Sequence, residues 1–146
     1  MLSGKQSGGA LRPAEVPPPE IVGVFSVFKL VVAGSRSFAD EGRLFADLDR
    51  LLARKLESDT VEIVTGGCRA GADVLAIRYA NARHLAVRVF SARWDIHGRA
   101  AGPIRNLEMA AYADALVAYW DGFSPGTKSM IRYARMYGRR VVVRYF

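Results

Sequence analysis

The strongest constraint on the fold is a repeated unit: an apolar, strand-like run, then a short loop rich in Gly and Ser, then a helical pattern. The unit occurs at residues 31–38 (VVAGSRSF), 63–73 (IVTGGCRAGAD) and 119–127 (YWDGFSPGT). Runs of Val and Ile without polar alternation are typical of parallel strands that are covered on both faces. A glycine-rich loop that opens a helix presents free N–H groups and the positive end of the helix dipole, which favours a phosphate-bearing ligand.

The alternation of strands and helices continues from residue 29 to the end of the chain. We expect strands at residues 29–33, 61–65, 86–90, 114–120 and 140–146, and helices at about 40–56, 71–83, 103–112 and 127–137. The first helix has its expected buried stripe at Leu44, Leu48, Leu51, Leu52 and Leu56. Right-handed crossovers join such elements into an α/β fold, here a three-layer Rossmann-like domain with a mainly parallel five-stranded sheet. The ligand is expected beyond the carboxyl ends of the strands, where the strand order reverses.

The length of the chain and its composition indicate one domain. The chain has 146 residues, 51% of them hydrophobic, and we place a single α/β domain at residues 29–146. Residues 1–28 are predicted to be a flexible extension, because a Gly/Ser-rich start is followed by four prolines between residues 13 and 19. The apolar stretch 21–28 is expected to extend the first strand, to pack on the domain, or to mediate a homodimer. The prolines and the acidic Glu15 and Glu20 argue against a signal peptide.

The cysteine content, the hydropathy and the charge of the chain limit its expected location and its expected ligands. Cys68 is the only cysteine, and no apolar run approaches the ~18 residues of a membrane span, so a cytoplasmic location without a membrane segment is expected. The net charge is +7, and the basic excess falls after residue 28. This charge indicates either an anionic ligand or a solubilising surface. Because His84 and His97 lack companion ligands, neither a metal site nor a cofactor is predicted.

Four separated motifs carry a resemblance to a known family. They are GSRSF (34–38), GGCRAGAD (66–73), WDIHGRAAGPIRNLEM (94–109) and WDGFSPGTKSMI (120–131). In this order they resemble the YspA-like branch of the SLOG superfamily, which joins the DNA-processing protein A fold to the cytokinin-activating LOG enzymes. The resemblance covers about residues 29–144. It implies a Rossmann-like domain that binds a nucleotide or a nucleotide-derived ligand, without an established reaction.

The first loop is predicted to bind phosphate. Gly34 and Ser35 offer a tight turn and a hydroxyl group, and Arg36 offers a planar guanidinium to a phosphate. The alternative for Arg36 is an ion pair with a local acid such as Asp40.

The second loop is expected to let a ligand approach the backbone closely. Gly66, Gly67 and Gly71 permit that approach, and Arg69 is placed for an anion. Asp73 falls in the first turn of the next helix, where a carboxylate either caps backbone N–H groups or accepts a ribose hydroxyl. We interpret Cys68 as an incidental small residue rather than a nucleophile.

The third motif has the features of a lid. Trp94 is expected to stack on a base, and Arg99 and Arg105, with the neighbouring Asn106, are expected to hold a second phosphate or a carboxylate. The alternative is a surface loop that Trp94 pins to the domain.

The fourth motif separates this chain from the LOG enzymes that it resembles. The LOG pattern is PGG-x-GT-x-x-E, whose glutamate serves the cleavage of an N-glycosidic bond. Here Ser124, Gly126 and Thr127 provide a helix start, and Met130 stands at the glutamate position. Because a thioether cannot act as a carboxylate does, cleavage by the same residue is not expected. Candidates for another carboxylate are Glu108, Asp121 and Asp95.

Three hypotheses on function follow. The first is a sensor or binding domain for a nucleotide-like small molecule, with Gly126 and Thr127 as donors. The second is an enzyme that acts on a nucleotide or its ribosyl derivative, such as an N-glycosidase or phosphoribohydrolase. The third is single-stranded DNA binding by the arginine-rich surface, with Trp94, Trp120 or Phe123 as stacking platforms.

Overall fold

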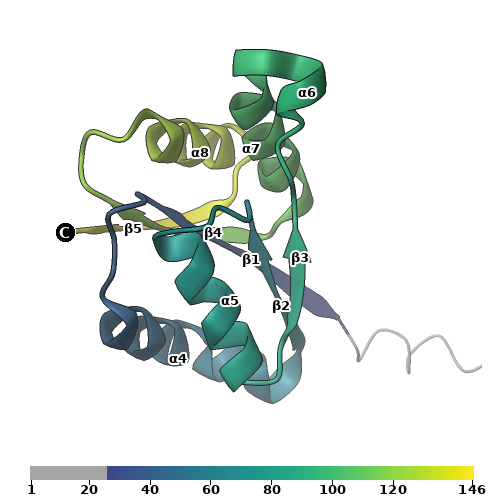
Figure 1. Ribbon diagram of the computed structural model, residues 1–146. Coiled ribbons are helices and arrows are strands. Elements are labelled where there is room, and N and C mark those ends of the chain that lie inside the picture. The colour runs from purple at the N-terminus through teal and green to yellow at the C-terminus, as the bar shows by residue number, and fades with distance from the viewer. Residues whose placement is uncertain (1–25) are drawn as a thin grey trace, which may run out of the picture.

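The computed structural model describes residues 26–146, which form alternating strands and helices (Figure 1). In chain order the elements are β1 (Val27–Gly34), α4 (Glu41–Ser58), β2 (Thr60–Thr65), α5 (Ala72–Ala82), β3 (Ala86–Val89), α6 (Trp94–His97), the 3-10 turn η1 (Gly98–Ala100), α7 (Ala101–Tyr112), β4 (Ala115–Trp120), α8 (Pro125–Met136) and β5 (Arg140–Tyr145). The predictions for residues 1–25 lie outside the described residues.

All five strands run parallel in the order β3-β2-β1-β4-β5. Leu30 of β1 lies between Ile63 of β2 and Ala115 of β4 in register. The helices α4 and α5 cover one face of the sheet, and α7 and α8 cover the other (Figure 1). The predicted α/β, Rossmann-like fold is therefore confirmed. The strand order reverses between β1 and β4, which is where such folds leave a crevice at the carboxyl edge.

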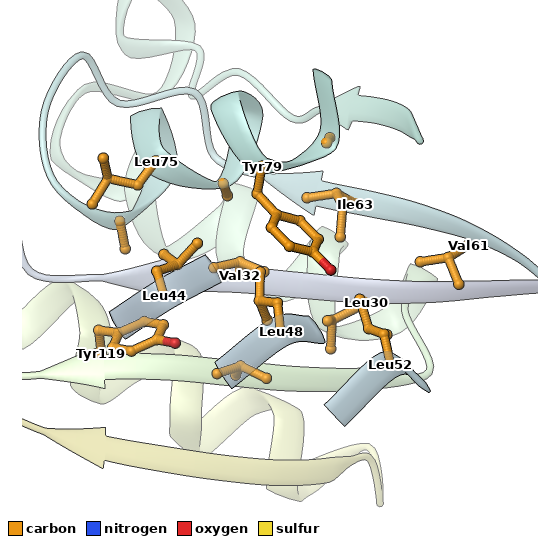
Figure 2. Close-up of a cluster of buried hydrophobic side chains, with 14 of the residues drawn as sticks. Leu30, Val32, Leu44, Leu48, Leu52, Val61, Ile63, Leu75, Tyr79 and Tyr119 are labelled. Carbon is orange, nitrogen blue, oxygen red and sulfur yellow. The ribbon is translucent and has the colours of Figure 1, made fainter. Parts of the chain in front are cut away.

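Successive side chains of β1 pack into two separate hydrophobic cores, one on each face of the sheet. Leu30 and Val32 face the α4–α5 side, whereas Val31 and Ala33 face the α7–α8 side. Figure 2 shows the first core, in which Leu44 and Leu48 of α4 and Tyr79 of α5 pack toward the sheet. The second core is built from side chains of α7 and α8, including Met109 and Met130. Burial on both faces explains why the strands are apolar without a break.

The expected stripe of α4 is only partly right. Leu44, Leu48 and Leu52 are buried, but Leu51 and Leu56 are 41% and 40% exposed, so their prediction as buried residues is wrong. At about 100° per residue, Leu56 falls at the margin of the stripe, whereas Leu51 falls between the angular positions of Leu44 and Asp47, which are both buried. The exposure of Leu51 therefore follows from its position along the helix rather than from its angle around the helix axis.

The boundaries of several elements differ from the prediction. The strand β1 begins at Val27, which pairs with Thr60, and β3 ends at Val89. The segment before the third expected helix contains the short helix α6 and the turn η1, and α7 begins at Ala101. Within residues 26–146, no helix is long and apolar enough to cross a membrane.

Candidate functional site

A cleft of about 1000 Å³ opens at the carboxyl edge of the sheet. It is lined by the β1–α4 loop, the β2–α5 loop, the segment around Trp94, and the first turns of α7 and α8. The predicted site residues line this cleft, with the exception of Gly71, Arg99 and Asp121. The start of α8 brings the backbone N–H groups of Gly126 and Thr127 to the cleft, which suits an anion.

The β1–α4 loop lies against the end of β4. The N–H of Ser35 donates to the carbonyl of Tyr119 at 2.9 Å, and the Ser35 hydroxyl accepts from the N–H of Asp121 at 3.3 Å. A Cβ on Gly34 would lie 2.5 Å from the Tyr119 carbonyl oxygen, so this close approach requires glycine. The chain thus holds the Ser35 hydroxyl, which was expected to serve a ligand, toward its own backbone.

Arg36 is exposed beside the cleft and does not form the alternative ion pair. Asp40 instead caps α4 by accepting from the N–H of Arg43 at 3.0 Å. Within residues 26–146, no carboxylate lies within 4.0 Å of the guanidinium of Arg36 or of Arg69. Both cations are therefore available to an anion in the cleft.

The β2–α5 loop is organised around the buried carboxylate of Asp73. Its Oδ2 accepts from the N–H of Cys68 at 3.0 Å, so Asp73 holds the loop in place. Burial raises the pKa of Asp73, while the bond from Cys68 and the charge of Arg105 oppose this rise. Burial, together with the Asp73 carboxylate, raises the pKa of the Cys68 thiol. The raised pKa favours the thiol over the thiolate, which disfavours nucleophilic attack by Cys68.

Arg105 and Asn106 brace three parts of the cleft. Arg105 donates from Nη1 to the Gly66 carbonyl at 2.7 Å and from Nε to the Asn106 side-chain oxygen at 3.0 Å. Asn106 is buried and donates to the Gly126 carbonyl at 3.2 Å and to Ser129 Oγ at 3.0 Å. The start of α7 is thereby tied to the β2–α5 loop and to α8. Sequence reasoning missed this bracing role, because the partners lie 20 to 39 residues away along the chain.

Trp94, Arg99 and Asp121 occupy different places. Trp94 is 58% exposed and lines the cleft, whereas Arg99 lies in the exposed turn η1 away from it. Asp121 accepts from the N–H groups of Ser124 at 2.7 Å and Phe123 at 2.8 Å, and from Ser124 Oγ at 2.7 Å. These bonds lower the pKa of Asp121 to about 2. Its carboxylate shapes the β4–α8 loop from outside the cleft.

The base of the cleft is apolar and poor in carboxylates. Met109 and Met130 are buried residues that line it, a role of Met109 that the sequence did not indicate. Among the lining residues Asp73 is the only acid, and none of Asp95, Glu108 and Asp121 lines the cleft. Within the described part of the chain, no cluster of three or more His, Cys, Asp or Glu side chains forms a candidate metal site.

Comparisons with known proteins point to one family. Residues 28–97 match the family described as "YspA, cpYpsA-related SLOG family". The Gene 61 protein of Mycobacterium phage D29 is 32% identical over 120 residues, which cover 78% of this chain and 94% of the phage protein.

Two solved structures share the fold, and both are DNA processing protein A. The Streptococcus pneumoniae protein superposes with a TM-score of 0.61 at 17% identity, over 80% of this chain. The chain spans 50% of the length of that protein. The Helicobacter pylori protein superposes with a TM-score of 0.60 at 19% identity, over 88% of this chain and 69% of its own.

Proposed function

Because the chain belongs to the YspA, cpYpsA-related SLOG family, we propose that its cleft binds a nucleotide or a nucleotide-derived small molecule. The observation that carries this proposal is the convergence of all three Gly/Ser-rich loops on one cleft at the carboxyl edge, with Arg36 and Arg69 beside it. Loop N–H groups, helix starts and unpaired guanidinium groups together form a suitable environment for phosphates.

Different parts of the cleft are proposed to bind different parts of the ligand. The start of α8, with Gly126 and Thr127, and the neighbouring Arg36 are proposed to hold a phosphate. Trp94 offers an exposed aromatic face to a base at the rim, and Met109 and Met130 offer an apolar surface to the rest of the ligand.

Binding is favoured over cleavage by the lack of a free carboxylate. Met130 occupies the position at which the LOG enzymes have their glutamate. The one acidic residue of the lining is Asp73, and its carboxylate already accepts a hydrogen bond from the backbone N–H of Cys68. Such a cleft can position a phosphate, but it offers little for proton transfer at a glycosidic bond. We therefore propose a sensor or ligand-binding domain in preference to an N-glycosidase.

A thermal-shift screen tests the proposal. The ligands are mononucleotides, dinucleotides, NAD, ADP-ribose and a short single-stranded oligonucleotide, because the Helicobacter pylori neighbour is described by its single-stranded DNA binding mode. A small-molecule ligand at 100 times its Kd should stabilise the fold by about 2.7 kcal/mol, a shift of several degrees in Tm. Chromatography of the mixture should recover the ligand intact, whereas a released base would establish the enzyme instead.

Two variants locate the binding. Arg36→Ala should raise the Kd for the nucleotide by about 10-fold or more, because the variant loses a charge-assisted hydrogen bond to the ligand. Arg54→Ala, which removes an exposed arginine of α4, should leave the Kd unchanged. Absence of any small-molecule shift, or equal effects of the two variants, would count against the cleft as the binding site.

A further inference from the structure

The positive charge of the chain is concentrated in its last part. Residues 122–146 contain six basic residues and no Asp or Glu, against a net charge of +7 for the whole chain. The basic residues are Lys128, Arg132, Arg135, Arg139, Arg140 and Arg144. These residues belong to α8, to the turn after it and to the edge strand β5, which contact one another (Figure 1).

Within the described residues, side-chain hydrogen bonds and ion pairs use only two of these cations. Arg139 donates to the carbonyls of Ala110 and Ala111 at the end of α7, at 2.9 and 2.8 Å. Arg144 forms an ion pair with Asp47. In the described part of the chain, the other four cations have no carboxylate within 4.0 Å. Arg132 lies over the ring of Tyr133, 5.4 Å from its centroid, and Arg135 lies in the last turn of α8, where a cation suits the helix dipole. These contacts leave all four positive charges without an acidic partner.

Three of the cations without an acidic partner border a groove between α8 and the end of β4. Lys128, Arg132 and Arg135 are spaced i, i+4 and i+7, which puts them on one face of the helix. Together with Trp120, Ile131 and Met136 they line a groove of about 500 Å³. None of these residues lines the cleft, so the two sites are separate.

Aromatic side chains accompany the cations. The ring of Trp120 in the groove lies 5.8 Å from that of Tyr145, measured between centroids. Of the exposed large apolar residues in 122–146, Phe123, Tyr137, Tyr145 and Phe146 are aromatic, and only Met136 is not. A row of cations beside aromatic rings is the arrangement that binds single-stranded nucleic acid, with phosphates on the cations and bases on the rings.

We propose that the groove on α8 and the adjoining edge of β5 bind single-stranded nucleic acid, independently of the ligand in the cleft. Lys128 and Arg135 are about 10 Å apart along the helix axis, so the cations form a row that can follow a phosphate backbone. The phosphates contact the basic rim, and a base lies against Trp120.

The charges disfavour the other occupants of this face. A second copy of the chain docked by the same face would bring two rows of cations together. A membrane needs several apolar side chains that project beyond the cations, whereas Ile131 is buried, Trp120 is half-buried and only Met136 of the apolar lining residues is exposed. An acidic protein segment offers carboxylates to the cations but no planar bases to the rings.

Fluorescence anisotropy with a labelled 20-nucleotide oligo-dT and the full chain tests this proposal. Arg132→Gln/Arg135→Gln should weaken the binding of oligo-dT by about 10-fold or more. The variant should also reduce the slope of log K against log salt concentration by about 1.4, because each phosphate contact on a single strand contributes about 0.7 to that slope. The matched control is Arg54→Gln/Arg78→Gln, which removes the same charge from α4 and α5. The control should change the affinity less than about two-fold, because neither arginine lines the groove, and loss of the exposed Arg78–Glu41 pair should hardly affect the stability of the fold.

A second readout places a base at Trp120. In Trp94→Phe, Trp120 is the remaining tryptophan, and oligo-dT should quench its fluorescence. Polyglutamate of equal length should neither quench it nor compete for binding at equal charge concentration. The proposal is overturned if the two double variants lose affinity equally, if polyglutamate or vesicles of phosphatidylserine and phosphatidylcholine bind as well as oligo-dT, or if oligo-dT does not bind. Because Arg36→Ala leaves this face intact, loss of nucleotide binding in the cleft leaves the oligo-dT result unaffected.

Discussion

The carboxylate of Asp47 joins three elements that are far apart in the chain. It is 3% exposed and accepts from the Tyr119 hydroxyl of β4 at 2.9 Å and from Arg144 Nη2 of β5 at 3.0 Å. Arg50, one turn further along α4, donates to it at 3.0 Å. Burial alone would raise the pKa of Asp47, but these hydrogen bonds outweigh burial and hold the pKa below its ordinary value. The stabilisation is therefore present at neutral pH and is lost as the pH falls through the folded-state pKa.

Asp47→Asn should lower the free energy of unfolding at pH 7 by about 2–3 kcal/mol, because it leaves Arg144 and Arg50 without a charged partner. The difference from the original chain should narrow at acid pH, as the pH falls from the ordinary pKa of an Asp carboxyl through the lower folded-state pKa of Asp47. Urea unfolding between pH 7 and pH 2.5 measures both effects. The exposed Glu57→Gln serves as the control, and a pH-independent loss in Asp47→Asn would contradict this account.

At the scale of elements, the two phosphate-loop candidates are packed directly on one another. Gly71, which precedes α5, has a φ of +78°, and a Cβ there would overlap the carbonyl oxygen of Ser35 and the Cα of Arg36. This explains why Gly71 supports the cleft without lining it. The β2–α5 loop can approach the β1–α4 loop this closely only because residue 71 has no side chain.

Gly71→Ala should therefore combine backbone strain with a steric clash, lowering the free energy of unfolding by about 2–4 kcal/mol and weakening ligand binding. Gly98→Ala separates the two causes, because Gly98 also has a positive φ, +56°, but a Cβ there meets nothing within 4 Å. We expect a loss of about 1 kcal/mol for this control. Equal losses in the two variants, measured by chemical denaturation, would rule out the clash.

For the whole molecule, one sheet separates two cores that share the strands β1 and β4. Leu48 belongs to the core under α4 and α5, and Met109 belongs to the core under α7 and α8. Since neighbouring residues of β1 contribute to both cores, neither core can lose its strands without exposing the other. The described residues should therefore unfold in a single cooperative transition.

Leu48→Ala and Met109→Ala should each lower the free energy of unfolding by about 2–4 kcal/mol, the cost of a cavity at a fully buried site. Near-UV circular dichroism and tryptophan fluorescence should report coincident urea transitions in both variants. The double variant should lose the sum of the two effects to within about 0.5 kcal/mol, because the residues lie on opposite faces of the sheet. Two separate transitions would show that the cores unfold independently.

Much of the fold, and most of the residues that line the cleft, could be predicted because both follow from local patterns in the sequence. Apolar runs predict the strands, and carboxyl ends of parallel strands meet at one edge, which places Gly34, Gly66 and Arg36 together. The bracing by Arg105 and Asn106 could not be predicted, since its partners come from other loops. The exposure of Leu51 and Leu56 was likewise missed, because helical periodicity does not specify how far the contact with the sheet extends along and around the helix.

The sequence by itself determined the order and type of the five strands and the four long helices, and the loops that end the strands, because short-range periodicity and glycine spacing encode them. The four motifs, in their order along the chain, carried the resemblance to the family. Only the tertiary structure decided that β4 lies beside β1, which brings the loop at Arg36 next to the start of α8. It also decided which polar groups of the cleft are free for a ligand and which, like the side chains of Ser35 and Asn106, are hydrogen-bonded within the protein. Those outcomes depend on contacts between residues tens of positions apart, and no local pattern in the chain records them.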